Sequence, residues 1–174
     1  MAPSLPAQES RAETYLEALP FLENLIKNRL VKGETERETF RIWNDILAQY
    51  FPGPKNYSIG PELFPEARRA VLFTAHLIPE TSWEEKKFIT VECMAPGLET
   101  EDSVWQDAFN KLEQDLADIS GQHRKYGAIA IGSCVRFYEW RDYQLFSIAD
   151  GQTFYLDRQC KTITKQLLDF RENH

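Results

Sequence analysis

The sequence predicts a single α/β domain in which helices flank a mixed β-sheet. Apolar residues recur at helical spacing near the N-terminus, in residues 100–120 and near the C-terminus. Between these segments, short runs rich in β-branched and aromatic residues have the alternation of strands. The resulting order is helix, helix, strands, helix, strands, helix, which is typical of an α/β or α+β layer arrangement. With 174 residues and 43% hydrophobic residues, the chain is long and apolar enough for one core.

The N-terminal part is expected to hold a tail and two amphipathic helices. Residues 1–10 contain two prolines and small polar residues, and we expect a disordered tail there, with the domain spanning residues 11–174. Residues 11–33 have leucines at helical spacing, a break or kink at Pro20, and Gly33 as the stop. Residues 34–51 repeat the pattern, and Thr35 with Glu38 has capping-box spacing.

The middle of the chain predicts an antiparallel strand pair followed by a helix. Residues 52–65 are rich in turn residues, with a short strand at 57–59. Strands are expected at 69–78 and 88–95, joined by the polar loop 80–87. Residues 100–120 form a strong helix with acidic residues in its first turn, where the helix dipole favours them.

The C-terminal part predicts further strands and a closing helix. Residues 126–140 form two strands separated near Gly132, and short strands follow at 143–148 and 153–157. Asp150 and Gly151 are expected to form the hairpin turn between the last two. A helix at 161–174 ends the chain. Aromatic residues beside Arg136 and Arg141 would suit stacking on a planar ligand, although sheet packing explains them as well.

Composition limits the classes of function. The three cysteines are widely spaced, as expected for reduced buried thiols rather than a zinc site. Residues 80–120 hold eleven acidic and three basic residues in a chain of net charge −7, which argues against avid binding to nucleic acid. The first residues have no signal-peptide pattern and no segment is apolar enough to span a membrane. We therefore expect a cytoplasmic protein without membrane contact, with a nuclear location as the alternative.

Three segments carry a family resemblance. "FITVECMAPG" (88–97), "VWQDAFNKLEQDL" (104–116) and "YGAIAIGSCVRFYEW" (126–140) resemble fungal hypothetical proteins with a PD-(D/E)XK, restriction-endonuclease-like fold. In those proteins a strand carries Glu-Cys-Lys, a helix with a Gln-Leu pair follows, and a strand with a YG and an RFY segment comes next. The resemblance covers about residues 50–140. It implies a core of helix, three-stranded meander, helix and strand.

The resemblance also implies a metal-dependent chemistry from which this sequence departs. In the family, an Asp of the middle strand and an acid of the next strand hold a divalent cation, and a Lys two residues later supports the nucleophile. Glu92 matches the acid, but Met94 stands at the position of the Lys, and residues 68–78 contain no carboxylate. Glu62 and Glu66 lie just upstream, and Lys111 is the residue that could replace the missing Lys.

Strand alternation suggests an alternative, metal-free pocket. Thr74 and His76 share one face of their strand, and Thr90, Glu92 and Met94 share one face of the next. In the usual antiparallel register these faces would coincide, so that His76 and Glu92 could form an acid/base couple. The remaining residues would bind or orient the ligand; they are Thr74, Thr90, Met94, Tyr138, Tyr57 and Lys111. The opposite interpretation is a half-buried histidine with Glu92 as its partner.

These observations lead to one leading hypothesis and two alternatives. The leading hypothesis is a degenerate nuclease fold that binds or transforms a small organic molecule by metal-independent acid/base chemistry, with Glu92, His76 and Lys111 as catalytic residues and no cofactor. The first alternative is a divergent Mg²⁺-dependent nuclease that uses Glu92 and Lys111. The second is a non-catalytic protein-interaction module. The apolar stripe of the N-terminal helices fits a core and would also fit a second copy of the chain, so a homodimer stays an open alternative.

Overall fold

The computed structural model describes residues 4–64 and 69–174. Its helices are α1 (Tyr15–Ala18), α2 (Phe21–Arg29), α3 (Glu36–Tyr50), α4 (Asp102–Asp118) and α5 (Cys160–Asn173). Its strands are β1 (Tyr57–Phe64), β2 (Arg69–Ile78), β3 (Glu84–Met94), β4 (Lys125–Ile131), β5 (Cys134–Arg141), β6 (Gln144–Ser147) and β7 (Phe154–Tyr155). Short 3₁₀ turns lie at Gly53–Lys55, Pro79–Thr81 and Ala149–Gly151.

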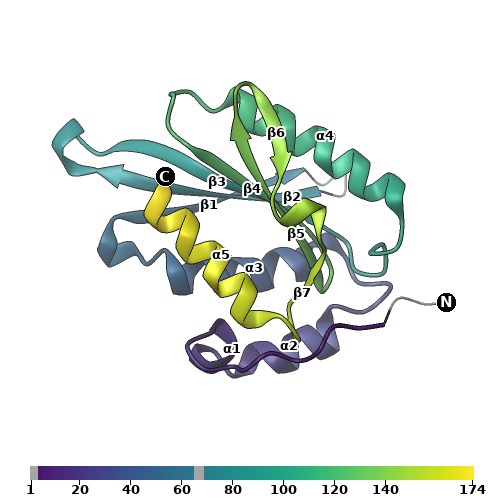
Figure 1. Cartoon of the computed structure of the whole chain (residues 1–174). Coiled ribbons are helices and arrows are strands. Elements are labelled where there is room, and N and C mark those ends of the chain that lie inside the picture. Colours follow the sequence, from purple (N-terminus) through teal and green to yellow (C-terminus); the bar gives the residue numbers. More distant parts are fainter. Residues whose placement is uncertain (1–3, 65–68) are drawn as a thin grey trace.

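The strands form one open mixed sheet in the order β1-β2-β3-β4-β5-β6, with β7 paired to β5. Strands β1, β2 and β3 form an antiparallel meander, and β3 pairs with β4 in parallel. A parallel pair needs a crossover connection, which α4 provides here. Strands β4, β5 and β6 then continue antiparallel. The chain is thus mixed α/β, as predicted, with helices flanking a mixed sheet (Figure 1).

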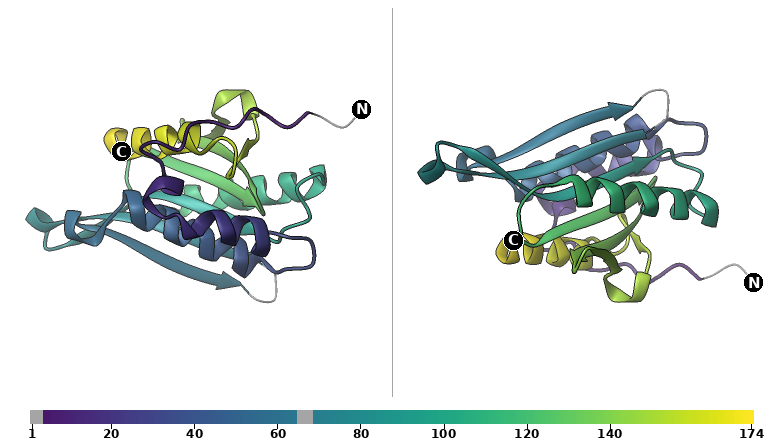
Figure 2. Two further views of the ribbon diagram at one scale, coloured as in Figure 1. Left: turned by 90° about the horizontal axis from the view of Figure 1, so that it is seen from below. Right: turned by 90° about the horizontal axis from the view of Figure 1, so that it is seen from above.

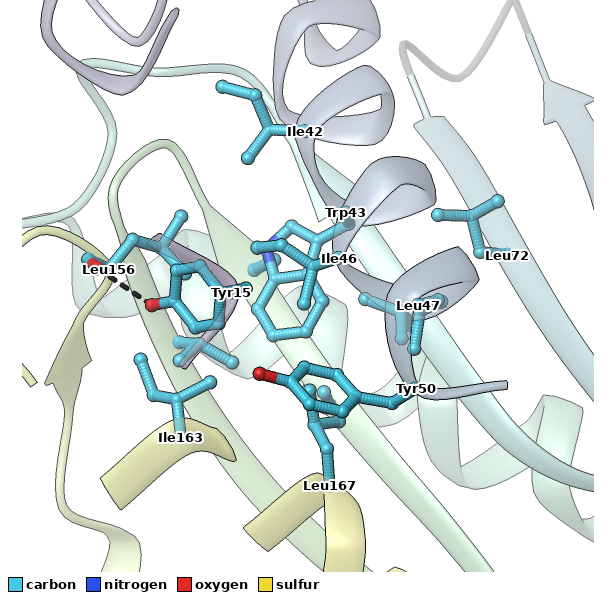
Figure 3. Packing of buried hydrophobic residues seen from close by; sticks show 14 of the residues in the cluster. Tyr15, Ile42, Trp43, Ile46, Leu47, Tyr50, Leu72, Leu156, Ile163 and Leu167 are labelled. Carbon is cyan, nitrogen blue, oxygen red and sulfur yellow. Dashed lines mark hydrogen bonds between the residues drawn. The ribbon is translucent and has the colours of Figure 1, made fainter. Parts of the chain in front are cut away.

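Helices cover both faces of the sheet, and each face has its own core. Helices α1, α2, α3 and α5 lie on one face, and α4 lies alone on the other (Figures 1 and 2). The larger core lies under α3 and α5, where Tyr50 and Trp43 of α3 meet Leu167 of α5 (Figure 3). In the same core the buried hydroxyl of Tyr15 donates to the carbonyl of Leu156 at 2.7 Å. This bond ties α1 to the segment that precedes α5.

The smaller core lies between α4 and the centre of the sheet. Leu112 of α4 packs against β4 directly over Gly127, where an added Cβ would come within 2.7 Å of a Leu112 methyl group. Leu116, one turn later, is fully buried in the same cluster. The absence of a side chain at Gly127 therefore lets α4 approach the sheet closely.

The N-terminal helical segment is divided at Leu19 and Pro20, in agreement with the predicted break at Pro20, because proline cannot continue the hydrogen-bonding pattern of α1. Two strand boundaries differ from the sequence predictions. Strand β1 is longer than residues 57–59, and β3 begins four residues before Phe88.

The predicted hairpin turn at Asp150–Gly151 is wrong. The 3₁₀ turn there is followed by β7, which pairs with β5 rather than with β6. The two-residue connection between antiparallel strands lies instead at Asp142–Tyr143, between β5 and β6.

Part of the predicted tail, residues 1–10, is bonded to the rest of the domain. Glu9, within the predicted tail, accepts a hydrogen bond from the backbone N–H of Thr162 at 2.8 Å, and its own N–H donates to Arg158 at 2.6 Å. This part of the tail is therefore attached to the start of α5. Across residues 4–64 and 69–174, no helix combines the length and apolar character that a membrane crossing requires.

Candidate functional site

Glu92 is a fully buried carboxylate on the α4 face of β3. Its neighbours Val91 and Cys93 point into the larger core, and Met94 lies in the smaller core with α4. Because strand side chains alternate, Glu92 shares the face of Met94. None of its side chain is exposed. A buried carboxylate needs a partner, and its identity determines what this site can do.

Arg69 is that partner, and it binds a second carboxylate at the same time. Its Nε donates to Glu92 Oε2 at 2.7 Å, and its Nη2 donates both to the other oxygen of Glu92 and to Asp115 of α4. The Arg69 side chain is 11% exposed and that of Asp115 is 21% exposed. The Phe64 ring lies 4.8 Å from the guanidinium carbon. We call Arg69, Glu92 and Asp115 the charge triad.

Strand pairing and helix periodicity bring the charge triad together. Arg69 opens β2 two residues before Val71, the residue that pairs with Glu92, so Arg69 and Glu92 share a face and the arginine side chain reaches Glu92 diagonally across the strand pair. Asp115 lies between Leu112 and Leu116, two of the α4 residues that are buried against the sheet. It therefore lies at the edge of the buried stripe, with its carboxylate over the start of β2.

The environment raises the pKa of Glu92 to about 7. Burial is the main cause, since it disfavours the charged form, and the neighbouring Asp115 raises the pKa further. The hydrogen bonds and positive charge of Arg69 act in the opposite direction without cancelling the effect of burial. Glu92 therefore exchanges its proton near neutral pH.

The predicted pocket of His76, Thr74, Thr90 and Glu92 does not form. Val71 pairs with Glu92 and Phe73 pairs with Thr90, so these residues share the α4 face. Thr74 and His76 belong to the alternate positions of β2 and therefore point to the opposite face. The assumed register was wrong by one position, and such an offset moves every side chain of a strand to the other face.

His76 lies instead in an aromatic cluster at the other face. Its ring stacks on Tyr57 with centroids 4.9 Å apart, and its Nδ1 lies 3.3 Å from Nε2 of His174. His174 in turn stacks on Phe88 at 3.8 Å. The predicted couple of His76 and Glu92 is therefore replaced by packing among aromatic rings, and Tyr57 belongs to this cluster rather than to the pocket of Glu92.

The other predicted ligand-binding residues are dispersed. Thr74 and Thr90 are fully buried, and neither hydroxyl has a hydrogen-bond partner in the described part of the chain. Met94 is 9% exposed and packs in the smaller core. Tyr138 pairs with Gly127 on β4, and that glycine pairs with Thr90, which places Tyr138 two strands away from β3.

Lys111 lies one helical turn before Asp115, on the same side of α4. It is half-buried, and it forms no ion pair with any residue in the described ranges. Arg69, and not Lys111, is the cation that contacts Glu92.

An open hollow of about 490 Å³ lies beside the charge triad, over the part of the sheet that α4 leaves uncovered. Four carboxylates surround it, together with one lysine and two half-buried phenylalanines. The residues that line it are Glu62, Phe64, Phe73, Glu85, Lys87, Asp115, Asp118, Ile119 and Ser120. We call this the acidic hollow. Asp115 belongs both to it and to the charge triad, and the Nζ of Lys87 lies 5.0 Å from the centroid of the Phe73 ring.

The donor set does not fit the divalent cation that the family resemblance implies. Glu92 stands at the position of the family's motif acid, and Asp115 is the carboxylate beside it. The guanidinium of Arg69 contacts both carboxylates and occupies the place that a cation would need. Within residues 4–64 and 69–174, no cluster of three or more His, Cys, Asp or Glu side chains is arranged to hold a metal ion. Glu66, one of the upstream carboxylates considered from the sequence, lies outside the described residues.

Sequence reasoning did not identify Arg69 and Asp115. Both lie outside the matched motif positions, and they meet Glu92 only through a strand pairing and a helix crossover. One signal was available, since a carboxylate predicted to lie within a sheet needs a cation. His76 and Lys111 were the residues predicted beside Glu92.

Comparison of the chain with protein-family models, with curated proteins and with solved structures finds no match.

Proposed function

We propose that this chain is a degenerate nuclease-like fold whose acidic hollow binds a small, positively charged organic molecule without a metal ion. The order of α3, the meander β1–β2–β3, α4 and β4 supports the nuclease-like part, because it is the order that the family resemblance implies. Glu92 lies on the third strand of this meander, as the motif acid would. The function itself is argued from the charges around the hollow.

The observation that carries the proposal is the position of Arg69 between Glu92 and Asp115. A divalent cation binds through several oxygen ligands, and two carboxylates at this position would be its first ligands. Here both carboxylates direct oxygens toward one guanidinium. The permanent positive charge of arginine repels a second cation and already satisfies these oxygens. This arrangement therefore supports a function in which Glu92 does not bind a metal ion.

The acidic hollow favours a positively charged ligand. Glu62, Glu85 and Asp118 line it from three different elements, and Lys87 is the basic residue among its lining. The Phe73 ring already faces the ammonium group of Lys87, which shows that this surface accommodates a cation over an aromatic face. An amine or guanidinium with an apolar stem would find carboxylates for its charge and phenylalanine rings for its stem.

Binding, rather than turnover, is what this geometry supports best. Glu92 has a pKa near neutrality, but its side chain has no exposed surface and both of its oxygens accept from Arg69. A ligand in the hollow would meet Asp115 and not Glu92. The role of Glu92 is then to fix Arg69, which in turn positions Asp115 at the wall of the hollow.

Calorimetric titration with two groups of ligands tests the proposal. Agmatine and spermidine represent organic cations, and MgCl₂ and MnCl₂ represent the nuclease alternative. We expect the organic cations to bind and Asp118→Asn to weaken their binding about fivefold, the effect of losing one charged contact of about 1 kcal/mol. Asp107→Asn removes the same charge from an exposed position of the same helix outside the hollow, and it should change binding less than about twofold.

Two results would overturn the proposal. One is absence of heat with either organic cation while the protein remains folded. The other is tight binding of Mg²⁺ or Mn²⁺ that is abolished in Glu92→Gln, which would instead support the divergent nuclease.

A further inference from the structure

An open hollow of about 360 Å³ lies between the first half of α4 and strands β5 and β6. Its sheet residues lie on the α4 face, since Arg136 pairs with Ile129 of the smaller core and side chains alternate along β5. The residues that line it are Asp102, Trp105, Gln106, Phe109, Arg136, Tyr138 and Ser147. We call it the α4–β5 hollow. It shares no lining residue with the acidic hollow, which lies at the other end of α4.

Arg136 is held in one orientation at the wall of the α4–β5 hollow. Its guanidinium carbon lies 4.0 Å from the centroid of the Trp105 ring, and its Nε donates to the hydroxyl of Thr153 at 2.8 Å. Trp105 is itself fixed, because it is 4% exposed and its indole N–H donates to the carbonyl of Glu99 at 2.8 Å. Stacking uses the face of the guanidinium and leaves the N–H groups of its two Nη atoms for a ligand. Such a fork matches the two oxygens of a carboxylate.

Two opposite charges line this hollow without neutralising each other. Arg136 is half-buried, and across residues 4–64 and 69–174 it forms no ion pair. Asp102, the exposed first residue of α4, likewise has no ionic partner within those ranges. A partly buried charge without a counter-charge is costly, so the state of Arg136 is a reason to look for an anion that binds it.

The remaining lining suits the body of a small organic molecule. Phe109 is half-buried and meets Tyr138 edge to face, with ring centroids 5.5 Å apart. Burial raises the pKa of Tyr138, and the charge of Arg136 acts in the opposite direction, so the guanidinium lies near this ring. Gln106 and Ser147 add polar groups at exposed positions. The volume is at the lower end of the range of small-molecule sites, which is about 300–1,000 Å³.

We propose that the α4–β5 hollow binds a free α-amino acid with an apolar side chain, in its zwitterionic form. The carboxylate would bind the Nη groups of Arg136, the ammonium would bind the carboxylate of Asp102, and the side chain would lie against Phe109. Among the described residues, the lining has one basic and one acidic side chain, and a zwitterion complements both. A simple anion would leave Asp102 without a cation, and a simple amine would leave Arg136 without an anion.

The test uses L-phenylalanine and two relatives that each lack one charge. 3-Phenylpropanoate has no ammonium group, and phenethylamine has no carboxylate. Calorimetry on the full chain at pH 7 measures L-phenylalanine alone and then with each relative as a competitor, so that binding of the amine elsewhere does not enter the result. We expect L-phenylalanine to bind this site at least about fivefold more tightly than either relative, since each relative loses one charged contact.

Single substitutions assign the two charges. Arg136→Gln should weaken binding of L-phenylalanine about tenfold, and Asp102→Asn about fivefold, because Asp102 is more exposed to solvent. Asp102→Asn should not weaken binding of 3-phenylpropanoate, which has no ammonium group. Asp107→Asn is the matched control, since it removes the same charge from an exposed position of α4 outside the hollow. It should change binding less than about twofold. If Arg136→Gln does not fold, Asp102→Asn decides alone.

Three results would contradict this site. The first is no heat of binding from L-phenylalanine with the folded wild type. The second is equal affinity for L-phenylalanine and 3-phenylpropanoate, which would show that the ammonium group is not recognised. The third is binding of L-phenylalanine that neither Arg136→Gln nor Asp102→Asn weakens. Asp118→Asn, at the acidic hollow, should leave binding of L-phenylalanine unchanged, so the two proposals are tested separately.

Discussion

Arg69 Nε lies 2.7 Å from Glu92 Oε2, which joins the first residue of β2 to a fully buried carboxylate of β3. The same guanidinium also binds Asp115 of α4. One side chain thus connects the β1–β2–β3 meander to the crossover helix α4. The consequences for stability can be measured without knowing the ligand.

Replacing Arg69 with methionine should destabilise the protein by about 3 kcal/mol at pH 8, because it leaves a buried carboxylate without its cation. The pKa of Glu92 should also rise, since Arg69 is the group that lowers it. Urea unfolding at pH 8 measures the loss. The double variant Arg69→Met/Glu92→Gln is the control and should recover part of it, because it removes the unpaired charge. Equal stability of Arg69→Met and wild type would contradict the ion-pair assignment.

Glu92 should make the wild-type protein less stable as pH rises from about 4.5 to 7. Its pKa in the folded protein is about 7, above the ordinary value of 4.5, so the folded state binds more protons than the unfolded state in this window. The stability contribution is fully present below the unfolded pKa and is lost as pH rises through the folded pKa. The change amounts to about 3 kcal/mol.

Glu92→Gln tests this pH dependence, because glutamine does not titrate. The free energy of unfolding, measured by urea at several pH values, should fall for the wild type relative to Glu92→Gln between pH 5 and 8, and the difference should level off above the folded pKa. A constant difference across this window would show that Glu92 titrates at an ordinary pKa in the folded state.

The sequence predicted the layers of this fold better than the relation between its strands. Apolar periodicity identified α3, α4 and α5, and alternation identified β2 and the end of β3, because each pattern is local to one element. The pairing of β2 with β3 is not local. Its register shifts between Thr74 and Ala75, where Phe88 is the additional residue of a bulge on β3. The residue pattern of neither strand reveals this shift in register. The shift determines that His76 and Glu92 lie on opposite faces of the sheet.

Of the charge triad, the sequence predicted Glu92 but not its partners Arg69 and Asp115. Glu92 was identified because a charged residue within an apolar strand is unusual. Arg69 lies 23 residues before Glu92 and Asp115 lies 23 residues after it. Each belongs to a segment rich in charged residues, so its sequence context does not distinguish it from its charged neighbours. Only the tertiary arrangement of β2, β3 and α4 selects them.

Gly127→Ala should destabilise the protein by about 1–3 kcal/mol, because its Cβ would meet the buried Leu112 side chain at 2.7 Å and push α4 away from β4. Gly60→Ala, in β1, is the matched control, since no atom of the residues that the structure describes lies within 4 Å of an added Cβ there. It should leave the stability unchanged or slightly raised. Thermal unfolding of both variants distinguishes the two cases. A neutral Gly127→Ala would mean that α4 does not rest on β4 at this point.

Glu9→Ala should lower the free energy of unfolding by about 1 kcal/mol, because it removes the carboxylate that accepts from the backbone of Thr162 in the first turn of α5. A negative charge at a helix N-terminus also interacts favourably with the helix dipole, so Glu9→Gln should recover only part of the loss. Gln8→Ala, at the exposed neighbouring position, should have no effect. Hydrogen exchange of the Thr162 amide provides a local measurement. Faster exchange in Glu9→Ala than in Gln8→Ala is expected, whereas equal rates would show that the tail does not hold α5 in solution.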